Sequence, residues 1–374
     1  MLAVVGISLA GRAQSAPQPG PVLRASAQQI LLSVSVLDKR GAPVTGLTAA
    51  DLTLTQDGRP QKIQSFAPDT ARPLQVGLLI DTSGRMSKAL GAERTAAAKF
   101  VQTLLSEGAG AAKNEAFLIH FDREVELLRD FTNSARELRS DLETLGPTSR
   151  DSREAQRGPE TPGDDRTWGR RVRGPQLYDA IFLASDEVMK TKHGHKALVI
   201  FSDGVDRGSK ESLNEATDAA DHAGLAIFTV YFRGERERGL DDYSGTDGGY
   251  PGGYPGGYPG GYPGGGYPGG YPGGYPGDGY PPPGGRRTKV TVDGKKILET
   301  IAQRTGGRAF EAKKTENLDE IYAQIAAELR GQYLLTFTPD IADKEGGYHK
   351  VTLKTSKGDD EVVIRQGYFA QNAD

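Results

Sequence analysis

The sequence contains no cysteine, and that absence removes several kinds of chemistry at once. Its 374 residues also include only 5 histidines, 3 methionines and 1 tryptophan. Without cysteine there is no disulfide bridge, no thiolate nucleophile and no cysteine-based zinc site. The cellular compartment stays open, because a chain of this length can bury a core that needs no disulfide.

A strong charge of one sign is missing as well. Lys and Arg together number 46 and Asp and Glu 49, which gives a formal net charge of −3. Nucleic-acid-binding proteins usually present a basic surface, so this balance argues against a nucleic-acid partner. The sequence also lacks a Gly-x-Ser-x-Gly turn and a phosphate-binding loop of the P-loop kind, and its histidines are scattered. We therefore expect a protein without enzymatic activity.

Long hydrophobic runs are absent apart from one short stretch at the start. "LAVVGISLA" is followed by small residues and by the proline-rich "QSAPQPGP". The stretch has the length of a signal peptide and is too short to span a bilayer. We expect residues 1–27 to be a signal peptide and linker, the mature protein to be periplasmic or extracellular, and no integral membrane segment to remain. A disordered or buried N-terminal segment is the alternative.

The two ends of the chain carry strand patterns. In residues 28–70, "ILLSVSVLD" alternates apolar and polar residues, and Asp57-Gly58 marks a hairpin turn. In residues 331–374, "QYLLTFTPD", "YHKVTLKTS" and "DEVVIRQGYFA" return to the same pattern. We expect the two ends to pair in a small antiparallel β-domain that contains or flanks the domain between them.

Residues 71–330 alternate apolar strands with amphipathic helices. "PLQVGLLI" and "KALVIFS" are almost continuously apolar, as in strands that are covered on both faces of a sheet. A helical pattern follows each strand. This alternation predicts an α/β domain with a doubly wound, mostly parallel, Rossmann-like sheet.

Polar side chains follow two of these strands. Asp81 comes directly after one strand, with Ser83 in the loop that follows, and Asp203 comes after another. The carboxyl ends of parallel strands share one edge, so we expect these residues to lie close together. Carboxylate and hydroxyl oxygens suit Mg²⁺ or Mn²⁺. The alternative is that these residues have only a structural role, since Asp after a strand is an ordinary helix cap and Ser-Asp-Gly is an ordinary turn.

Three motifs carry a family resemblance. "LLIDTSGRM", "LYDAI" and "LVIFSDG", in this order and spacing, resemble the von Willebrand factor type A (VWA) domain. The patterns in 28–70 and 331–374 resemble the flanks of an exported bacterial VWFA-related family of acidobacterial type. The resemblance implies a VWA fold and adhesion-type protein binding at a metal-ion-dependent adhesion site (MIDAS). Such a site takes oxygens from an Asp-x-Ser-x-Ser loop, from a Thr before the "LYDA" helix and from the Asp of the "DG" turn, and it leaves a position for a carboxylate of the ligand.

This sequence matches the implied site only in part. Asp81, Ser83 and Asp203 are present, but Arg85 replaces the second serine and Pro175 replaces the threonine. Neither replacement has a side-chain oxygen, so we expect a degenerate site with weak affinity for an ion. Arg85 has two alternative placements: it swings outward into solvent, or its guanidinium lies between the two aspartates in place of the ion.

Two segments break the α/β pattern, and both are expected beside this edge of the sheet. Residues 146–174 are polar and mixed in charge, which predicts a disordered loop, and residues 247–285 are a low-complexity Tyr-Pro-Gly-Gly repeat. One interpretation is that they help to bind the ligand; the other is loop expansion without a role. The contact residues proposed under the first interpretation are Arg85, Arg170, Arg171, Arg173, Tyr250, Tyr254 and Tyr258.

These observations lead to one main hypothesis and one alternative. The main hypothesis is an exported, non-enzymatic protein-binding or adhesion module of the VWA type with a degenerate metal site. The alternative is a structural or assembly protein whose metal site is inactive and whose contacts are made by the β-domain or by the Tyr-Pro-Gly-rich loop. The sequence does not identify the protein ligand.

Overall fold

The computed structural model describes residues 29–106, 113–147, 174–235, 293–339 and 347–370. The chain divides into two compact units. Residues 70–327 form one, here called the α/β unit, and residues 1–69 with 328–374 form the other, here called the β unit. The predicted signal peptide, most of the predicted disordered loop and the whole Tyr-Pro-Gly-Gly repeat lie outside the described residues.

A six-stranded sheet forms the centre of the α/β unit, with the strand order β10-β9-β8-β5-β6-β7. All neighbouring strands are parallel except β6 and β7, which are antiparallel. The predicted class, a doubly wound and mostly parallel α/β sheet, is confirmed. The strands are β5 (Leu74–Asp81), β6 (Glu115–Phe121), β7 (Val125–Thr132), β8 (His195–Ser202), β9 (Ala226–Phe232) and β10 (Ala309–Ala312).

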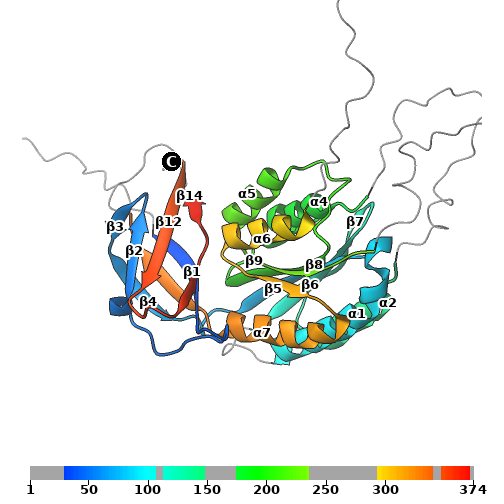
Figure 1. The fold of residues 1–374 in the computed structure, drawn as a ribbon, viewed down its shortest axis with the longest axis horizontal. Helices are drawn as coiled ribbons and strands as arrows, with labels where there is room; N and C mark the ends of the chain where they lie inside the picture. The colour runs from blue at the N-terminus through cyan, green and yellow to red at the C-terminus, as the bar shows by residue number, and fades with distance from the viewer. Residues whose placement is uncertain (1–28, 107–112, 148–173, 236–292, 340–346, 371–374) are drawn as a thin grey trace, which may run out of the picture. The chain divides into compact units, whose positions relative to one another are not determined.

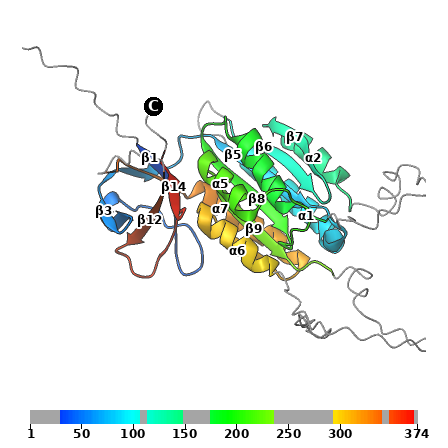
Figure 2. The same ribbon diagram turned by 90° about the horizontal axis from the view of Figure 1, so that it is seen from above.

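Helices cover both faces of this sheet. Figure 1 shows α4, α5 and α6 on one face and α1, α2 and α7 on the other. Figure 2, seen from above, shows strands of this sheet running side by side, with α5 lying over them. The helical segments are η2 (Gly84–Met86), α1 (Ser87–Ser106), α2 (Ala135–Thr144), α4 (Leu177–Phe182), η3 (Leu183–Met189), α5 (Leu213–Ala223), α6 (Gly294–Thr305), η4 (Thr315–Asn317) and α7 (Leu318–Arg330).

The complete burial of the central strand β5 explains why its sequence is so apolar. All eight of its residues are buried, because helices cover both faces of the sheet there. Gly77 lies in the middle of the strand, and a Cβ at this position would collide with the side chains of Phe117 and Leu198. The glycine therefore lets two large side chains of the neighbouring strands close over β5.

Local signals set the ends of several helices. Ser212 and Glu215 form a reciprocal capping box at the start of α5, and Gly224 ends that helix in the left-handed conformation, with φ of 70°. The helix that contains "LYDAI" begins at Leu177, two residues after Pro175, and continues as the π-helical segment η3. Pro175 is thus part of the loop before the helix.

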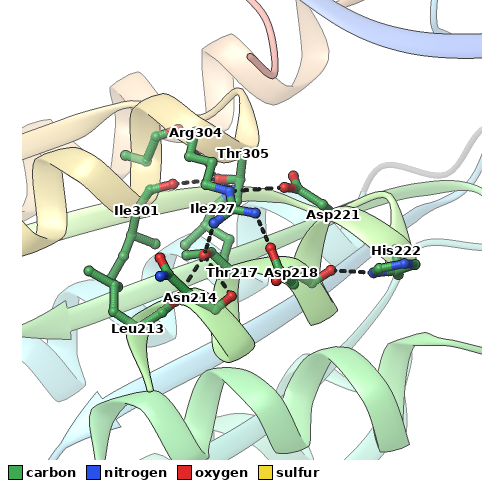
Figure 3. A network of polar contacts seen from close by, with 11 residues as sticks. Leu213, Asn214, Thr217, Asp218, Asp221, His222, Ile227, Ile301, Arg304 and Thr305 are labelled. Atoms are coloured by element: carbon green, nitrogen blue, oxygen red, sulfur yellow. Dashed lines mark hydrogen bonds and ion pairs between the residues drawn. The ribbon is translucent and has the colours of Figure 1, made fainter. Parts of the chain in front are cut away.

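A network of polar contacts fastens α6 to α5 (Figure 3). Arg304, in the last turn of α6, donates from Nη1 to Thr217 Oγ1 at 2.6 Å and from Nε to Asp221 Oδ2 at 3.1 Å. Its Nη2 also pairs with Asp218. Asp221 is buried, so the arginine neutralises a carboxylate that is out of contact with water.

The β unit consists of two four-stranded sheets, ordered β13-β1-β11-β4 and β14-β12-β2-β3. Side chains of both sheets, among them Leu32, Leu54, Leu335 and Leu353, belong to one hydrophobic cluster. The elements are β1 (Ile30–Leu37), η1 (Ala49–Asp51), β2 (Leu52–Gln56), β3 (Arg59–Gln61), β4 (Ile63–Pro68), β11 (Tyr333–Phe337), β12 (Tyr348–Thr355), β13 (Glu361–Val363) and β14 (Gly367–Phe369).

Strands from the two ends of the chain pair within the β unit. β1 pairs with both β11 and β13, β4 with β11, and β2 with β12, all antiparallel. The turn at Asp57-Gly58 has positive φ at both residues, as a tight hairpin requires. The strand expected after this turn is divided, because β3 joins one sheet and β4 the other.

Candidate functional site

Two aspartates meet at the carboxyl edge of the α/β sheet. Asp81 is the last residue of β5, and Asp203 directly follows β8. The two strands are parallel neighbours, with Ile80 opposite Phe201, so their ends coincide. Asp81 is 0% and Asp203 3% exposed. The sequence-predicted pair of carboxylates therefore lies together, and it is buried.

Asp81 is held by two hydrogen-bond donors. The Ser83 backbone N–H donates to Asp81 Oδ1 at 2.9 Å, and Ser202 Oγ donates to Asp81 Oδ2 at 2.7 Å. Burial, reinforced by the nearby charge of Asp203, raises the pKa of Asp81 to about 7, although the hydrogen bonds from both serines oppose this rise. Burial thus favours the protonated form of this carboxyl group.

Ser202 was not among the sequence-predicted residues. It is the last residue of β8 and follows Phe201, which pairs with Ile80. Its hydroxyl therefore reaches Asp81, the residue after Ile80, across the two strands. The sequence held this signal, because a serine directly precedes Asp203 at the end of a buried strand. Ser83, by contrast, was predicted, and its Oγ is buried without a hydrogen-bond partner among the described residues.

Arg85 turns inward and pairs with Asp203. Its Nε donates to Asp203 Oδ2 at 2.5 Å, and the two side chains are 17% and 2% exposed. Among the described residues Arg85 makes no hydrogen bond to Asp81. Of the two placements weighed from the sequence, the outward one does not occur, and the inward one involves one aspartate rather than both.

The residues after β9 close over this ion pair. A Cβ at Gly234 would collide with the Asp203 carboxylate and lie 3.1 Å from the Cβ of Arg85. The backbone N–H of Glu235 donates to the carbonyl of Arg85 at 2.8 Å, and the Glu235 side chain pairs with Lys88. The backbone around Gly234 therefore keeps Arg85 against Asp203.

Pro175 occupies the loop where the resemblance implies a threonine. It has no side-chain oxygen to offer, and its carbonyl accepts hydrogen bonds from the backbone N–H groups of Arg207 and Gly208, at 2.9 and 3.3 Å. The start of α4 is capped instead by Ser209, whose Oγ accepts from the backbone N–H groups of Tyr178 and Asp179, each at 3.1 Å. The loop after Asp203 thus covers the helix end.

An open groove lies beside this loop. It has a volume of about 1080 Å³ and is bordered by the β6–β7 turn, by α4 and η3, and by residues 207–211. Its lining combines apolar side chains with charged groups of both signs. Among the lining residues are Arg123, Gln176, Phe182, Arg207 and Lys210.

A second polar chain holds the loop after Asp81 from the other side. The Thr82 N–H donates to the carbonyl of Phe121 at 3.0 Å, and Thr82 Oγ1 lies 3.1 Å from His120 Nδ1. His120 Nε2 in turn lies 3.1 Å from Glu126 Oε2. The sequence analysis missed this arrangement, because its three residues come from three segments. Thr82 is only 1% exposed, so the chain of contacts anchors the loop.

The remaining predicted contact residues are not placed. Arg170, Arg171 and Arg173, and likewise Tyr250, Tyr254 and Tyr258, lie outside the described residues.

The residues present do not fit a divalent ion held in the way that the resemblance implies. Ser83 Oγ, buried and unpartnered, would suit such an ion. However, Arg85 already neutralises Asp203, and Pro175 supplies no side-chain oxygen. In the described part of the chain, no group of three or more His, Asp or Glu side chains gathers in a way that could hold a metal. Mg²⁺ or Mn²⁺ would have to displace a guanidinium that backbone packing holds in place.

No family model and no curated protein matches the sequence. Among solved structures, the chain is similar to an aerotolerance-related membrane protein from Bacteroides fragilis NCTC 9343, with 14% identity and a TM-score of 0.39, over 68% of this chain and 98% of that one. It is also similar to the vWF domain of the type V pili tip protein Mfa5 from Porphyromonas gingivalis, with 13% identity and a TM-score of 0.39, over 68% and 94%.

A third similar structure is proximal thread matrix protein 1 from the mussel byssus with a zinc-occupied MIDAS motif. The identity is 10% and the TM-score 0.39, over 70% of this chain and 48% of that one. These values describe a distant likeness in fold alone. The VWA-type fold of the α/β unit rests on its own strand order and on the aspartates at the ends of β5 and β8. Membership of the exported bacterial VWFA-related family stays a prediction.

No helix within the described ranges is long and apolar enough to cross a membrane.

Proposed function

We propose that this protein is an exported, non-enzymatic, adhesion-type binding module that recognises a protein partner at the carboxyl edge of its VWA-type sheet. The observation that carries the proposal is the geometry of that edge. A partly exposed arginine, anchored on a buried aspartate, lies at the same edge of the sheet as an open groove lined by apolar and charged side chains. In open α/β sheets the carboxyl edge is where ligands bind.

The same edge gives little support to catalysis. Thr82, His120 and Glu126 form a line of contacts that resembles a nucleophile, a base and an orienting acid. Yet the Thr82 hydroxyl is buried, and it also lies 3.4 Å from the carbonyl of Phe121, a second acceptor. A nucleophile has to reach its substrate. The arrangement therefore serves to hold the loop that carries Asp81 and Ser83.

Export is the second part of the proposal. It is supported by the composition of residues 1–27, an apolar stretch of signal-peptide length followed by small residues and a proline-rich segment. N-terminal sequencing of the protein recovered from the periplasmic or culture fraction would show cleavage after the apolar stretch. Recovery of the uncleaved chain from the cytoplasm would contradict it.

One observation favours the alternative function of assembly through the β unit. Two of the three large apolar side chains that are exposed among the described residues belong to this unit, Leu31 at 48% and Tyr348 at 41%. Exposed apolar side chains on strands are common contact points between proteins. Under this alternative the aspartate edge has no binding role.

Photo-crosslinking at single positions tests both functions. A photoreactive phenylalanine analogue would replace Arg207 or Lys210 at the groove, Leu31 or Tyr348 in the β unit, or Arg139, an exposed α2 residue, as the background control. We expect crosslinks to another protein from the groove positions in cells that produce the full chain. Crosslinks only from Leu31 and Tyr348 would favour assembly, and groove positions that crosslink no more than Arg139 would overturn the proposal.

A further inference from the structure

The guanidinium of Arg85 has hydrogen-bond donors left over at the edge where the strand-end aspartates lie. A guanidinium carries five N–H groups. Arg85 uses its Nε on Asp203, and among the described residues neither of its Nη groups makes a hydrogen bond or an ion pair. The side chain is 17% exposed, so part of it is open to a molecule that approaches from solvent.

The oxygens of the nearby aspartates already have hydrogen-bond partners. Both oxygens of Asp81 accept hydrogen bonds, from Ser83 and Ser202. Asp203 accepts from the Val205 N–H on Oδ1, at 3.1 Å, and from Arg85 on Oδ2. A ligand at this point therefore meets Nη donors without a partner among the described residues and carboxylate oxygens that are already hydrogen-bonded, which favours a ligand that brings acceptors.

We propose that Arg85 takes the place of the divalent ion at this edge and that its Nη groups bind a carboxylate of the protein partner without any metal. The inference rests on the proposed function, since it names the ligand chemistry of that same edge. The planar guanidinium matches the two oxygens of a carboxylate. A phosphate matches this geometry too, but its second negative charge is repelled more strongly by Asp81 and Asp203.

The packing around Arg85 supports a fixed binding group. Gly234 leaves room for the Asp203–Arg85 pair only because it has no side chain, and the Glu235 N–H holds the carbonyl of Arg85. These contacts fix the base of the side chain and keep it from turning outward. A binding group held in this way loses little conformational freedom when the ligand arrives.

The first test observes the guanidinium directly in the unmodified full chain. The probe is N-acetyl-glutamate α-amide, with N-acetyl-glutamine α-amide as the matched neutral control, both titrated at constant ionic strength with EDTA present. Arginine side-chain NMR signals are followed, and the Arg85 signals are identified by their loss in Arg85→Lys. We expect a saturable shift of the Arg85 signals with the glutamate derivative only, because the neutral glutamine derivative has no carboxylate for the bidentate contact.

Three outcomes of this titration would overturn the inference. One is an Arg85 signal that does not respond to the glutamate derivative. Another is an equal response to the glutamine derivative. The third is inorganic phosphate shifting the Arg85 signals at lower concentration than the carboxylate does, which would mean that the ligand class is wrong.

The second test asks whether Arg85 is what excludes the ion. Mn²⁺ binding is measured by electron paramagnetic resonance on the wild type, on Arg85→Ser, and on Arg207→Ser, the same substitution at an exposed position of the neighbouring loop. We expect Arg85→Ser to bind Mn²⁺ at least tenfold more tightly than the other two, because it frees Asp203 and adds a hydroxyl. Equal binding by wild type and Arg85→Ser would overturn the inference. If Arg85→Ser does not fold, Arg85→Gln replaces it under the same criteria.

The failure of this inference and the failure of the proposed function look different. Groove crosslinks without an Arg85 response to the carboxylate would support the proposed binding function and contradict carboxylate binding by Arg85. An Arg85 response without groove crosslinks would support carboxylate binding by Arg85 and contradict the proposed function, because no protein partner would bind at this edge.

Discussion

Asp203 and Glu93 are two of the buried carboxylates of the α/β unit, and they are neutralised in different ways. At the sheet edge Asp203 pairs with Arg85. Between α1 and α7, Glu93 is 0% exposed and its Oε1 accepts a hydrogen bond from the hydroxyl of Tyr322, which packs on Phe100 with ring centroids 5.0 Å apart. Arg85 remains partly exposed with unused donors, whereas Tyr322 is 2% exposed and has no second donor.

The Asp203–Arg85 region is suited to binding a ligand, whereas the Glu93–Tyr322 region is a closed part of the packed interior. A guanidinium carries its own charge to the buried carboxylate. A tyrosine supplies only a hydroxyl, and burial then raises the pKa of Glu93 to about 8. Burial at the Glu93 site thus favours the protonated carboxyl group, whereas Asp203 has a cationic partner.

Breaking the Asp203 ion pair should have the largest effect. Arg85→Ala leaves a buried carboxylate with the Val205 N–H as its remaining partner, and we expect a loss of about 3 kcal/mol in the free energy of unfolding. Urea unfolding followed by circular dichroism at 222 nm reports on the α/β unit, which holds the long helices. The double variant Arg85→Ala, Asp203→Asn should recover more than half of the loss, because no buried charge remains. An equal loss in both variants would contradict this account.

The Glu93 site should respond to pH, and the sign follows from its raised pKa. Between the ordinary value of 4.5 and the folded-state value of about 8, the folded protein holds a proton that the unfolded chain has released. Stability contributed by this group is therefore complete below that window and falls as pH rises through it. Glu93→Gln removes the dependence, so its stability relative to wild type should improve by about 2 kcal/mol from about pH 6.5 to pH 9.

Tyr322→Phe provides the matched control for that comparison. It keeps the ring contact with Phe100 and removes the hydroxyl that Glu93 accepts from. The pH dependence should then persist or grow, since the carboxyl group is still buried. A flat pH profile for Tyr322→Phe would show that Glu93 is not the group responsible.

The Arg304 network sharpens the comparison, because it joins an arginine to a buried carboxylate away from the aspartate edge. Asp221 is 3% exposed, and Arg304 also bonds Thr217 and Asp218. We expect Arg304→Ala to lower the free energy of unfolding by about 2 kcal/mol. Hydrogen exchange should become faster in α5 and α6 of this variant. Its Arg85 NMR signals should stay unchanged. A change at Arg85 would mean that the two sites are coupled.

The smallest effect is expected at Arg207, which is exposed in the loop after Asp203. Its backbone N–H caps the carbonyl of Pro175, and a change of side chain keeps that bond. Arg207→Ser should move the melting temperature by less than about 2 °C. A larger shift would show that its side chain supports the loop, and the variant would then not serve as a control for Arg85→Ser.

Most of the fold could be predicted from sequence patterns. The continuous apolar run before Asp81 predicted a strand buried on both faces, and β5 is buried at all eight positions. The position of Asp203 at the same edge also followed, because parallel strands end together. What the patterns missed were contacts between distant segments, such as Thr82 with His120 and Ser202 with Asp81, because periodicity reports only which face a residue occupies.

The sequence by itself determined the α/β class, the meeting of Asp81 and Asp203, and the absence of side-chain oxygens at positions 85 and 175, since these depend on residue type and on strand order. Only the tertiary structure decided where Arg85 points. Its two placements differ by rotation of one side chain, and the choice is made by the buried carboxylate of Asp203 and by the backbone of Gly234, which lies far along the chain. An ionised group can stay buried only beside a partner of opposite charge, and which partner arrives is a property of the folded chain.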